Sequence, residues 1–286
     1  MPDIGLRNTL RVVREAPPGA YLDGGPLGEI LLPRRYVTKG TVPGAQIDVF
    51  LYRDSEDRLV ATTETPHAMV GDFAFLKVVS VSRGIGAFLD WGLSKDLLLP
   101  LREQTRTLAA GDQVVLYVFL DPRSGRIVAT TRLNRHLAQT APAYREGQRV
   151  ALLIAGETPL GFKAIVENAH AGLLYAAELS GPLEIGQRLD GYVRKVRADG
   201  KIDLGLDPAG YRRVASLTEQ IIEALKAGGG RLECDDASSP EEIRVAFQTS
   251  KKAFKQALGA LYRERRIRFT KPGIEWAEDA KPKPSC

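Results

Sequence analysis

Residues Gly86–Pro100 read GAFLDWGLSKDLLLP, and two related stretches occur elsewhere in the chain. Gly19–Pro33 reads GAYLDGGPLGEILLP and Gly161–Tyr175 reads GFKAIVENAHAGLLY, so the three copies begin 67 and 75 residues apart and align without gaps. A spaced self-match of this kind indicates repeated structural units. The sequence therefore predicts a chain of small tandem β-modules.

The repetition extends beyond these stretches. Each unit contains about five short apolar or β-branched segments, bounded by glycine, proline or aspartate turns, and no long helical pattern. Five short strands are the number expected of an OB-type barrel. The same interval of 11 residues separates three pairs of positions: Pro33 and Gly44, Pro100 and Gly111, and Tyr175 and Gly186.

From about Ser216 the apolar pattern changes to a helical period. Gly228–Gly230 ends the first predicted helix, and Ser239 with Pro240 caps the second. The predicted elements are helices around Leu217–Leu225 and over Glu241–Gln248 and Lys251–Arg265, a brief strand at Leu232–Cys234, and a hairpin of Ile267–Phe269 and Ile274–Trp276. Three helices and a hairpin in this order predict a winged helix.

The predicted fold is mainly β with a small α+β C-terminal domain. The predicted domains are OB-fold barrels at residues 1–63, 64–138 and 144–210, a winged helix at 215–276 and a disordered tail at 277–286. A chain of 286 residues is longer than one ordinary domain of about 100–200 residues, which agrees with several small modules.

Composition indicates a folded protein with a mild basic excess. Hydrophobic residues make up 44% of the chain, and 40 Lys and Arg against 35 Asp and Glu give a net charge of +5, which is compatible with polyanionic partners. No signal peptide or membrane-spanning apolar stretch is recognised, which predicts a cytoplasmic protein without a membrane partner. Cys234 and Cys286 lack the spacing of a disulfide framework or a zinc site.

The repeated units resemble the RNA-binding OB-fold domain of the S-one type. They share a glycine, a small residue, an aromatic, an aliphatic, a glycine-rich turn, and a later Asp-turn-Gly-Arg-Ile segment. Three such units before a winged helix resemble the bacterial conserved virulence factor B family, as do FLDWGLSKDLLLP at Phe88–Pro100, DSEDRLVATTETP at Asp54–Pro66 and SKKAFKQALGALY at Ser250–Tyr262. The resemblance covers about residues 4–276 and implies RNA binding and a role in regulating bacterial gene expression.

Strand alternation selects the candidate stacking residues. Ala87 and Leu89 suit the barrel interior, which leaves Phe88 on the outer surface. The same parity places Tyr21 outside in the first unit. An exposed aromatic on an OB surface can stack on a base, and the S-one-type resemblance implies RNA contact at this position. The alternative is that both rings pack against a neighbouring module or the barrel rim.

The third unit departs from this pattern. Lys163 takes the outward position of Phe88, with Phe162 pointing inward, and a lysine can meet phosphate but cannot supply the same stack. Tyr175 stands where many S-one-type domains have a contacting histidine or aromatic residue. Lys163 and Tyr175 are therefore candidate RNA contacts as well.

Arg58, Arg126 and Lys201 occupy the basic position that the resemblance places in the last strand of each unit. Asp54 and Asp121 precede the turn in the first two units. A cation there can contact phosphate while the aspartate orients the loop. The alternative is an ordinary ion pair within the turn.

The third helix of the predicted winged helix is strongly basic. Its candidate nucleic-acid contacts are Lys251, Lys252, Lys255, Arg263 and Arg266. A basic helix can enter a duplex groove or follow an RNA backbone. The alternative is a solvated helix face, which commonly carries lysines at this spacing.

Sequence motifs of common enzyme classes are not found. The chain lacks a phosphate-binding G-x-x-x-x-G-K-S/T loop and a dinucleotide fingerprint, and its three histidines fall in different units without metal-ligand spacing. Asp235 and Asp236 suggest a metal-dependent nuclease, but two adjacent carboxylates before a helix cap are more often a solvated turn. The sequence predicts no active site, metal, cofactor or small-molecule substrate.

These observations predict a non-enzymatic regulator that captures single-stranded RNA by base stacking and phosphate contacts. One alternative is a DNA-binding regulator in which the winged helix binds duplex nucleic acid and the barrels are a scaffold. A second is a nuclease or enzyme subunit whose carboxylates come together only in the folded chain.

Overall fold

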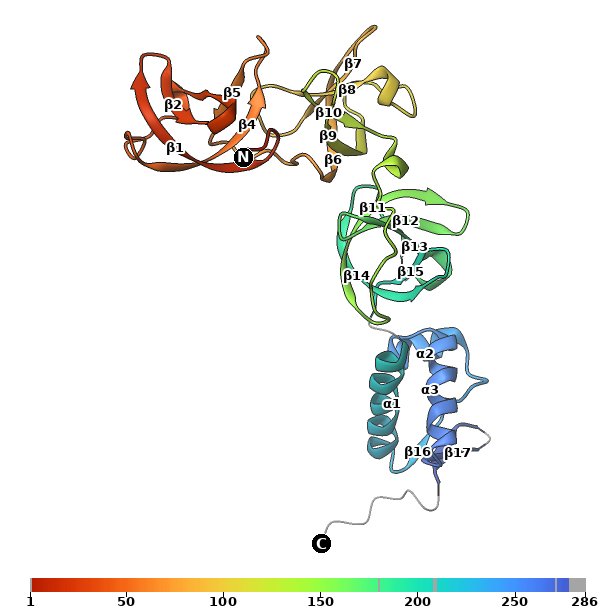
Figure 1. The fold of residues 1–286 in the computed structure, drawn as a ribbon. Helices are drawn as coiled ribbons and strands as arrows, with labels where there is room; N and C mark the ends of the chain where they lie inside the picture. Colours follow the sequence, from red (N-terminus) through yellow and green to blue (C-terminus); the bar gives the residue numbers. More distant parts are fainter. Residues whose placement is uncertain (1, 180, 208–209, 271, 278–286) are drawn as a thin grey trace. The chain divides into compact units, whose positions relative to one another are not determined.

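The fold is described from a computed structural model for residues 2–179, 181–207, 210–270 and 272–277. Along these residues, three closed five-stranded barrels come first, and a domain of three helices and a small antiparallel sheet follows (Figure 1). The predicted fold class is therefore confirmed. The predicted disordered tail lies outside the described residues, apart from Ala277.

The three barrels have strands of similar length and order. Barrel 1 consists of β1 (Arg7–Ala16), β2 (Gly19–Asp23), β3 (Glu29–Pro33), β4 (Gln46–Arg53) and β5 (Leu59–Thr62). Barrel 2 consists of β6 (Phe73–Ser82), β7 (Gly86–Asp90), β8 (Leu97–Pro100), β9 (Gln113–Leu120) and β10 (Ile127–Thr130). Barrel 3 consists of β11 (Arg149–Thr158), β12 (Gly161–Val166), β13 (His170–Tyr175), β14 (Arg188–Val196) and β15 (Ile202–Gly205).

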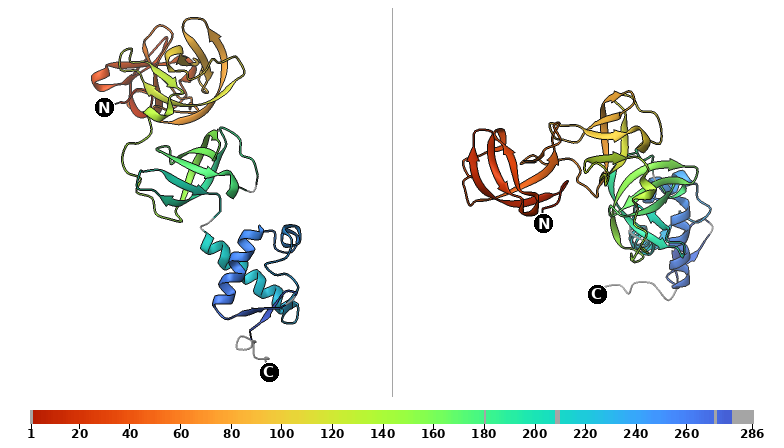
Figure 2. Two further views of the ribbon diagram at one scale, coloured as in Figure 1. Left: turned by 90° about the vertical axis from the view of Figure 1, so that its right-hand side faces the viewer. Right: turned by 45° about the horizontal axis from the view of Figure 1, so that its top comes forward.

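The strand order is the same in all three barrels. Each follows the OB-type order first, second, third, fifth, fourth, and closes by pairing the fourth strand with the first. Figure 2 shows the three barrels from two further sides. The long first strand has an irregularity at one corresponding place in every barrel, near Val13, Val79 and Ala155. A bulge at this place bends the strand so that it can pair with two neighbours around a closed barrel.

A glycine begins the second strand of every barrel. Gly86 begins β7 opposite Pro100 with a φ of +151°, a backbone conformation that residues with a Cβ rarely adopt. A methyl group at Gly86 would collide with the carbonyl oxygen of Leu99. Gly19 and Gly161 occupy the corresponding positions with φ of +152° and +143°, and each approaches a carbonyl of the facing strand in the same way. The repeated stretch begins with glycine because this backbone contact excludes a side chain.

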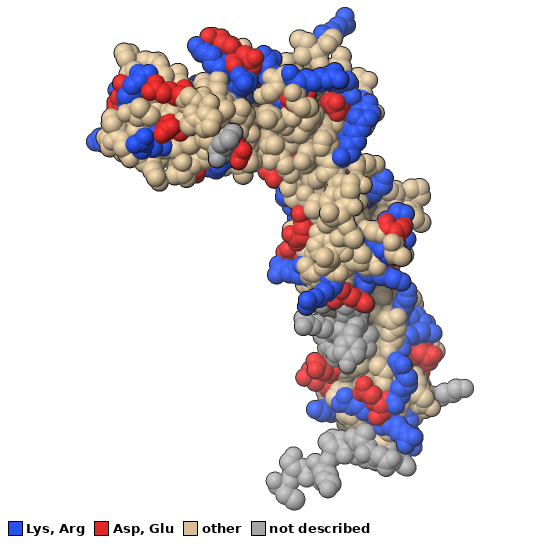
Figure 3. Space-filling view, viewed as in Figure 1, with Lys and Arg blue, Asp and Glu red and all other residues tan. Residues whose placement is uncertain are grey.

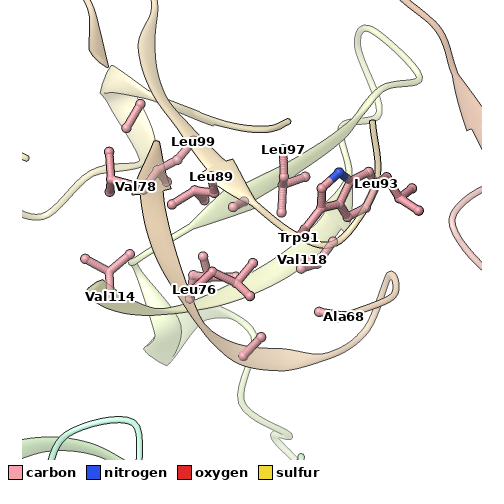
Figure 4. Close-up of a cluster of buried hydrophobic side chains, with 14 of the residues drawn as sticks. Ala68, Leu76, Val78, Leu89, Trp91, Leu93, Leu97, Leu99, Val114 and Val118 are labelled. Atoms are coloured by element: carbon pink, nitrogen blue, oxygen red, sulfur yellow. The ribbon is translucent and has the colours of Figure 1, made fainter. Parts of the chain in front are cut away.

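Alternating side chains fill each barrel. In barrel 2, Leu89, Leu97 and Leu99 converge on the interior from β7 and β8, and Trp91 closes one end beside Leu93 (Figure 4). All five are less than 9% exposed. Complete burial of one such aliphatic side chain contributes about 1.5–3 kcal/mol. The alternation that buries these residues also decides which side chains remain outside.

The first two barrels share an apolar cluster. Phe50 and Tyr52 of β4 and Val60 of β5 pack with the core residues of barrel 2. The ring of Phe50 meets Trp91 edge to face, with centroids 5.7 Å apart. Both barrels belong to the first of two compact units into which the chain divides, because residues 1–143 all fall in that unit. Barrels 1 and 2 are therefore packed together.

Asn168, in the turn between β12 and β13, joins barrel 3 to the start of β6. The N–H of Phe73 donates to Asn168 Oδ1 at 2.7 Å, and Asn168 Nδ2 donates to the carbonyl of Gly71 at 3.0 Å. Phe73 also packs with Leu153 and Ile165. Asn168 has a φ of +54°, which asparagine tolerates better than most residues. The turn thus supplies the polar contacts to Phe73, and strands β11 and β12 supply the apolar ones.

The C-terminal domain has the predicted winged-helix order. Its elements are α1 (Gly210–Ala227), β16 (Arg231–Leu232), α2 (Pro240–Phe247), α3 (Lys251–Arg263), β17 (Ile267–Phe269) and β18 (Ile274–Trp276). The sheet has the order β16-β18-β17, and the core of the domain joins Leu225 of α1, Phe254 of α3 and Ile274 of β18. The β17–β18 hairpin, which forms the wing, lies at the predicted residues.

Several boundaries differ from the prediction. The strand predicted at Leu232–Cys234 is β16 at Arg231–Leu232, and α2 spans Pro240–Phe247 and not Glu241–Gln248, because Gln248 adopts a left-handed conformation with a φ of +49°. α1 begins at Gly210, six residues before the change of period near Ser216. The sequence did not predict this start because glycine and the mixed residues after it show no apolar helical pattern. α3 ends at Arg263 and not at Arg265, because Arg265 adopts a left-handed conformation with a φ of +56° that terminates the helix.

The predicted helix ends are confirmed at two places. Ser239 Oγ accepts a hydrogen bond from the N–H of Glu242 at 3.2 Å, and the Glu242 carboxylate accepts one from the N–H of Ser239 at 2.7 Å. This reciprocal pair is a capping box. Gly229 and Gly230, with φ of +69° and +98°, terminate α1 by returning N–H groups to its last carbonyls.

Replacing Gly86 with alanine is expected to lower the free energy of unfolding by at least about 2 kcal/mol, because the methyl group strains the backbone and collides with a carbonyl. Urea unfolding followed by circular dichroism measures this loss. Gly156→Ala is the matched control, since a methyl group there meets no atom within 4 Å, and its effect should stay below about 0.5 kcal/mol. Equal losses for the two variants would contradict the steric explanation.

Candidate nucleic-acid interface

One position on the second strand of each barrel carries Tyr21, Phe88 or Lys163. In barrel 2, Ala87 and Leu89 on either side are 0% exposed, whereas Phe88 is half-buried. Tyr21 is also half-buried between two buried neighbours, and Lys163 is exposed. The structure therefore has the predicted alternation, and these three side chains lie on the outer surfaces of their barrels. Phe162, expected to point inward, is only half-buried.

Tyr21 already has a partner on its ring. The guanidinium carbon of Arg14 lies 3.8 Å from the ring centroid, and Arg14 is held there by Glu29 at 2.7 Å. A cation over the ring face is a favourable contact. A base could use that face of Tyr21 only after displacing Arg14.

Phe88 lines a pocket of about 110 Å³ where barrel 2 meets barrel 1. The lining residues are Tyr52 and Arg53 of barrel 1 and Phe88, Trp91, Lys95, Asp96, Leu97, Leu98, Arg126, Ile127 and Val128 of barrel 2. The pocket thus combines aromatic and aliphatic surface with basic side chains from both barrels. Sequence analysis selected Phe88 and Arg126, and the structure brings these two together.

Lys95 fixes the turn of barrel 1 at this pocket. Its Nζ donates to the carbonyl oxygens of Arg53 and Asp54, each at 2.8 Å. Burial lowers the pKa of Lys95, and the positive charge of Arg126 lowers it further. Sequence reasoning missed this residue. The repeat did contain a signal, since Lys95 stands where the first copy has Gly28.

Arg126 reaches across to barrel 1. Its Nε lies 3.0 Å from Asp57 Oδ1, and both side chains are about half exposed. Arg53 of barrel 1 donates in return to the carbonyl of Gly125 at 3.3 Å. An exposed ion pair contributes only about 0–1 kcal/mol. Arg126 can therefore exchange Asp57 for a phosphate at little cost.

Arg58 forms the ion pair within its own turn. Its Nε and one terminal nitrogen donate to the same Asp54 oxygen at 2.9 and 2.7 Å, and Glu56 lies 2.8 Å away. Partial burial raises the pKa of Asp54, but the hydrogen bonds from Arg58 and from backbone N–H groups outweigh this and lower it. The geometry of Arg58 fits the alternative of an ordinary ion pair within the turn, because the carboxylates of Asp54 and Glu56 already neutralise its charge.

The predicted contacts of barrel 3 form a small polar network. The Tyr175 hydroxyl donates to Asp203 at 3.3 Å, and Arg197 donates to that hydroxyl while pairing with Asp203 at 2.9 Å. The N–H of Arg197 bonds to the carbonyl of Lys201, so Arg197 occupies the position of the turn aspartate in barrels 1 and 2. Lys201 itself is ion-paired at 2.7 Å with the aspartate two residues earlier. Lys163, the remaining predicted contact of this barrel, is exposed.

The five predicted basic residues of the winged helix lie on or just after α3. Lys252, Lys255, Arg263 and Arg266 are exposed, and Lys251 is half-buried. Their contacts are Lys251 to the Ala237 carbonyl at 3.3 Å, Lys255 to Asp236 at 3.9 Å, Arg263 to the Gly259 carbonyl at 3.1 Å, and Arg266 to Glu264 at 3.8 Å. Lys and Arg side chains gather over these elements, with Asp and Glu among them (Figure 3).

The adjacent aspartates serve the turn before α2. Asp235 accepts hydrogen bonds from the N–H groups of Gly273, Ala237 and Ser238, and these lower its pKa, the bond from Gly273 most. Within the described ranges, no three His, Cys, Asp or Glu side chains gather as metal ligands. None of the helices in those ranges has the length and apolar character needed to cross a membrane.

Family comparisons agree with this domain order. The S1 domain model matches residues 4–64 and 70–132, and the CvfB-like winged helix domain model matches residues 219–275. The uncharacterized protein YitL of Bacillus subtilis (strain 168) is 26% identical, over 92% of this chain and 90% of its own. Conserved virulence factor B of Staphylococcus haemolyticus (strain JCSC1435) is 24% identical, over 82% of this chain and 83% of its own.

A solved structure is similar over nearly the whole chain. It is described as the crystal structure of a multidomain protein with nucleic acid binding domains from Streptococcus pneumoniae TIGR4. It is 23% identical, covers 96% of this chain and 98% of its own, and has a TM-score of 0.41.

The fold and the matched domains define a protein built from nucleic-acid-binding domains, with S1 barrels followed by a winged helix. The domain order and the relatives agree with the resemblance read from the sequence. The chain is similar to the conserved virulence factor B family in its winged-helix domain and, at 24% identity to one member, over most of its length.

Replacing Lys95 with methionine is expected to lower the free energy of unfolding by about 1–3 kcal/mol, because it leaves the carbonyls of Arg53 and Asp54 without their donor. Hydrogen exchange should also speed up in the turn at residues 54–58. Urea unfolding and exchange mass spectrometry measure the two effects. Lys201→Met is the control, since Lys201 is 73% exposed and should leave stability almost unchanged. Unaltered exchange in the turn of the Lys95 variant would show that Lys95 does not hold it.

Proposed function

We propose that this chain is a non-enzymatic RNA-binding protein that captures single-stranded RNA on its barrels. The observation that carries the proposal is the pocket beside Phe88, which combines an outward aromatic ring with Lys95 and Arg126 of barrel 2 and with Arg53 of barrel 1. An aromatic ring next to cations suits a nucleotide, which has a flat base and a charged phosphate. The S1 domain matches over both barrels support the same assignment.

The pocket has room for no more than one base. Its volume of about 110 Å³ is of the order of an apolar cavity, near 150 Å³, that holds a single benzene ring. A base inserted there would stack on Phe88, while its phosphate would replace Asp57 as the partner of Arg126. A duplex keeps its bases stacked inside the helix, so it cannot supply this base without unpairing.

The other barrels would add weaker contacts. Lys163 offers an exposed ammonium to phosphate, and Tyr21 can stack only by displacing Arg14. Tyr175, Arg58 and Lys201 are tied to partners within their own barrels. Joining several weak sites in one chain raises the overall affinity, because each later contact is intramolecular.

The biological role we propose is regulation of bacterial gene expression in the cytoplasm. Support comes from similarity to the conserved virulence factor B family and from matches to nucleic-acid-binding domains. An RNA-binding protein without catalytic groups can act by occupying a transcript or by presenting it to other proteins.

Phe88→Ala is expected to weaken binding of a single-stranded oligouridine to the full chain by about 5- to 150-fold, because it removes one base stack worth about 1–3 kcal/mol. Fluorescence anisotropy of the labelled oligonucleotide gives the dissociation constants. Val42→Ala, which removes an exposed apolar side chain of barrel 1, is the control and should bind like the unaltered chain.

Two results would reject this function. One is unchanged affinity of the Phe88 variant with its thermal unfolding intact. The other is tighter binding of duplex DNA than of single-stranded RNA by the unaltered chain, which would favour the DNA-binding alternative.

A salt titration tests the phosphate contact of Arg126. Arg126→Gln should lose this contact and therefore reduce the slope of log affinity against log salt concentration.

A further inference from the structure

The last part of β6 has a neighbouring strand on one side only. β9 pairs with β6 over Phe73–Lys77, whereas β7 pairs with it over Lys77–Ser82. On the β9 side, the N–H and C=O of Val78 still bond to the loop before β9. Within the described ranges, no strand pairs with residues 79–82 on that side. These residues therefore form a strand edge to which a further strand can be added.

The side chains along this edge are small and uncharged. Residues 78–82 read VVSVS, and Val79 and Val81 are 49% and 43% exposed. Valine favours extended backbone and is usually buried. An exposed strand edge that carries such residues pairs readily with another chain. Composition and exposure thus both suit this edge to strand addition.

The other two barrels protect the corresponding edge. The register with the second strand shows that Val81 of barrel 2 corresponds to Glu15 of barrel 1 and to Glu157 of barrel 3. The turn that follows contains two prolines in barrel 1, one in barrel 3 and none in barrel 2. Charged residues and prolines at an edge prevent pairing with other chains. Barrel 2 lacks both devices at this place, although its fold is the same.

Charge around the edge selects the kind of partner. Residues 77–85 read KVVSVSRGI, with two exposed cations, Lys77 and Arg83, and no acidic residue. A second copy of this chain that paired antiparallel about Ser80 would bring Lys77 opposite Arg83. Like charges that face each other across a ladder are destabilising. A strand with carboxylates on either side of its apolar residues would instead place an opposite charge near each cation.

Two more apolar side chains lie beyond the edge. Ile85 and Leu101 are exposed, and the N–H of Leu101 donates to the carbonyl of Ile85 at 3.1 Å. An added strand gains main-chain hydrogen bonds from an edge and specificity from the side chains around it. We propose that residues 79–82 of β6 are a docking site for an extended segment of another protein, in which apolar residues are flanked by Asp or Glu.

The test uses the full chain and a labelled synthetic peptide in which alternating valine and threonine are flanked by glutamates. Fluorescence anisotropy is expected to show binding with a dissociation constant below about 1 mM. Hydrogen exchange should slow at residues 79–82 when the peptide is added, but not at residues 13–16, the corresponding edge of barrel 1. A peptide with lysines in place of the glutamates should bind at least about fivefold more weakly.

Backbone methylation of the peptide tests strand pairing itself. A peptide whose valine and threonine N–H groups are all methylated keeps its side chains and charges but cannot donate to the edge. It should bind at least about fivefold more weakly than the unmethylated peptide, because the main-chain hydrogen bonds are lost.

Val81→Glu gives barrel 2 the residue that the other barrels have at this position. It should weaken binding of the glutamate-flanked peptide at least about fivefold, because a carboxylate then faces the added strand. Thermal unfolding should change little, since the side chain of Val81 is exposed. Val245→Glu is the matched control, because it makes the same change at an 82% exposed residue of α2 and should leave peptide binding unaltered.

Five outcomes would overturn the proposal. Three concern the peptide: no binding or no slowing of exchange at residues 79–82, equal binding of the methylated peptide, and unchanged affinity of the folded Val81 variant. A dimer in sedimentation that Val81→Glu dissociates would show that a second copy of the chain covers the edge instead. Slowing of exchange at residues 79–82 by oligouridine and not by the peptide would assign the edge to RNA.

Discussion

Close contact between a glycine and the carbonyl of a facing strand underlies the architecture of all three barrels. Gly19, Gly86 and Gly161 have backbone conformations closed to other residues and begin the second strand where only a hydrogen atom fits. This contact sets the register of the hairpin that follows. Since a shift of one residue would turn every side chain to the opposite face, it also sets which residues face outward.

The same outward position has a different environment in each barrel. Tyr21 lies under Arg14, Phe88 lines a pocket against a neighbouring barrel, and Lys163 is exposed. These differences arise from residues around the strand and not from the strand itself. Packing of barrel 1 against barrel 2 replaces an open stacking face with a pocket and brings Arg126 to Asp57. Ligand chemistry in such a chain therefore depends on how its modules pack.

The winged helix illustrates the limit of reading charge alone. Its lysines and arginines are compatible with duplex binding, single-strand binding or simple solvation. Tyr262 and Phe269, whose ring centroids lie 5.4 Å apart, add exposed ring surface that the charge pattern does not indicate.

Local patterns in the sequence were sufficient for the repeats, the barrel and winged-helix classes, the outward parity of Phe88, and the helix cap at Ser239. These features depend on backbone geometry and on residues close together in the chain, so periodicity reveals them. Tertiary structure alone decided that Lys95 holds the turn of barrel 1, that Arg126 meets Asp57, and that Tyr262 lies beside Phe269. Such contacts join different elements, and two of them join different barrels, so they depend on packing that no local pattern records.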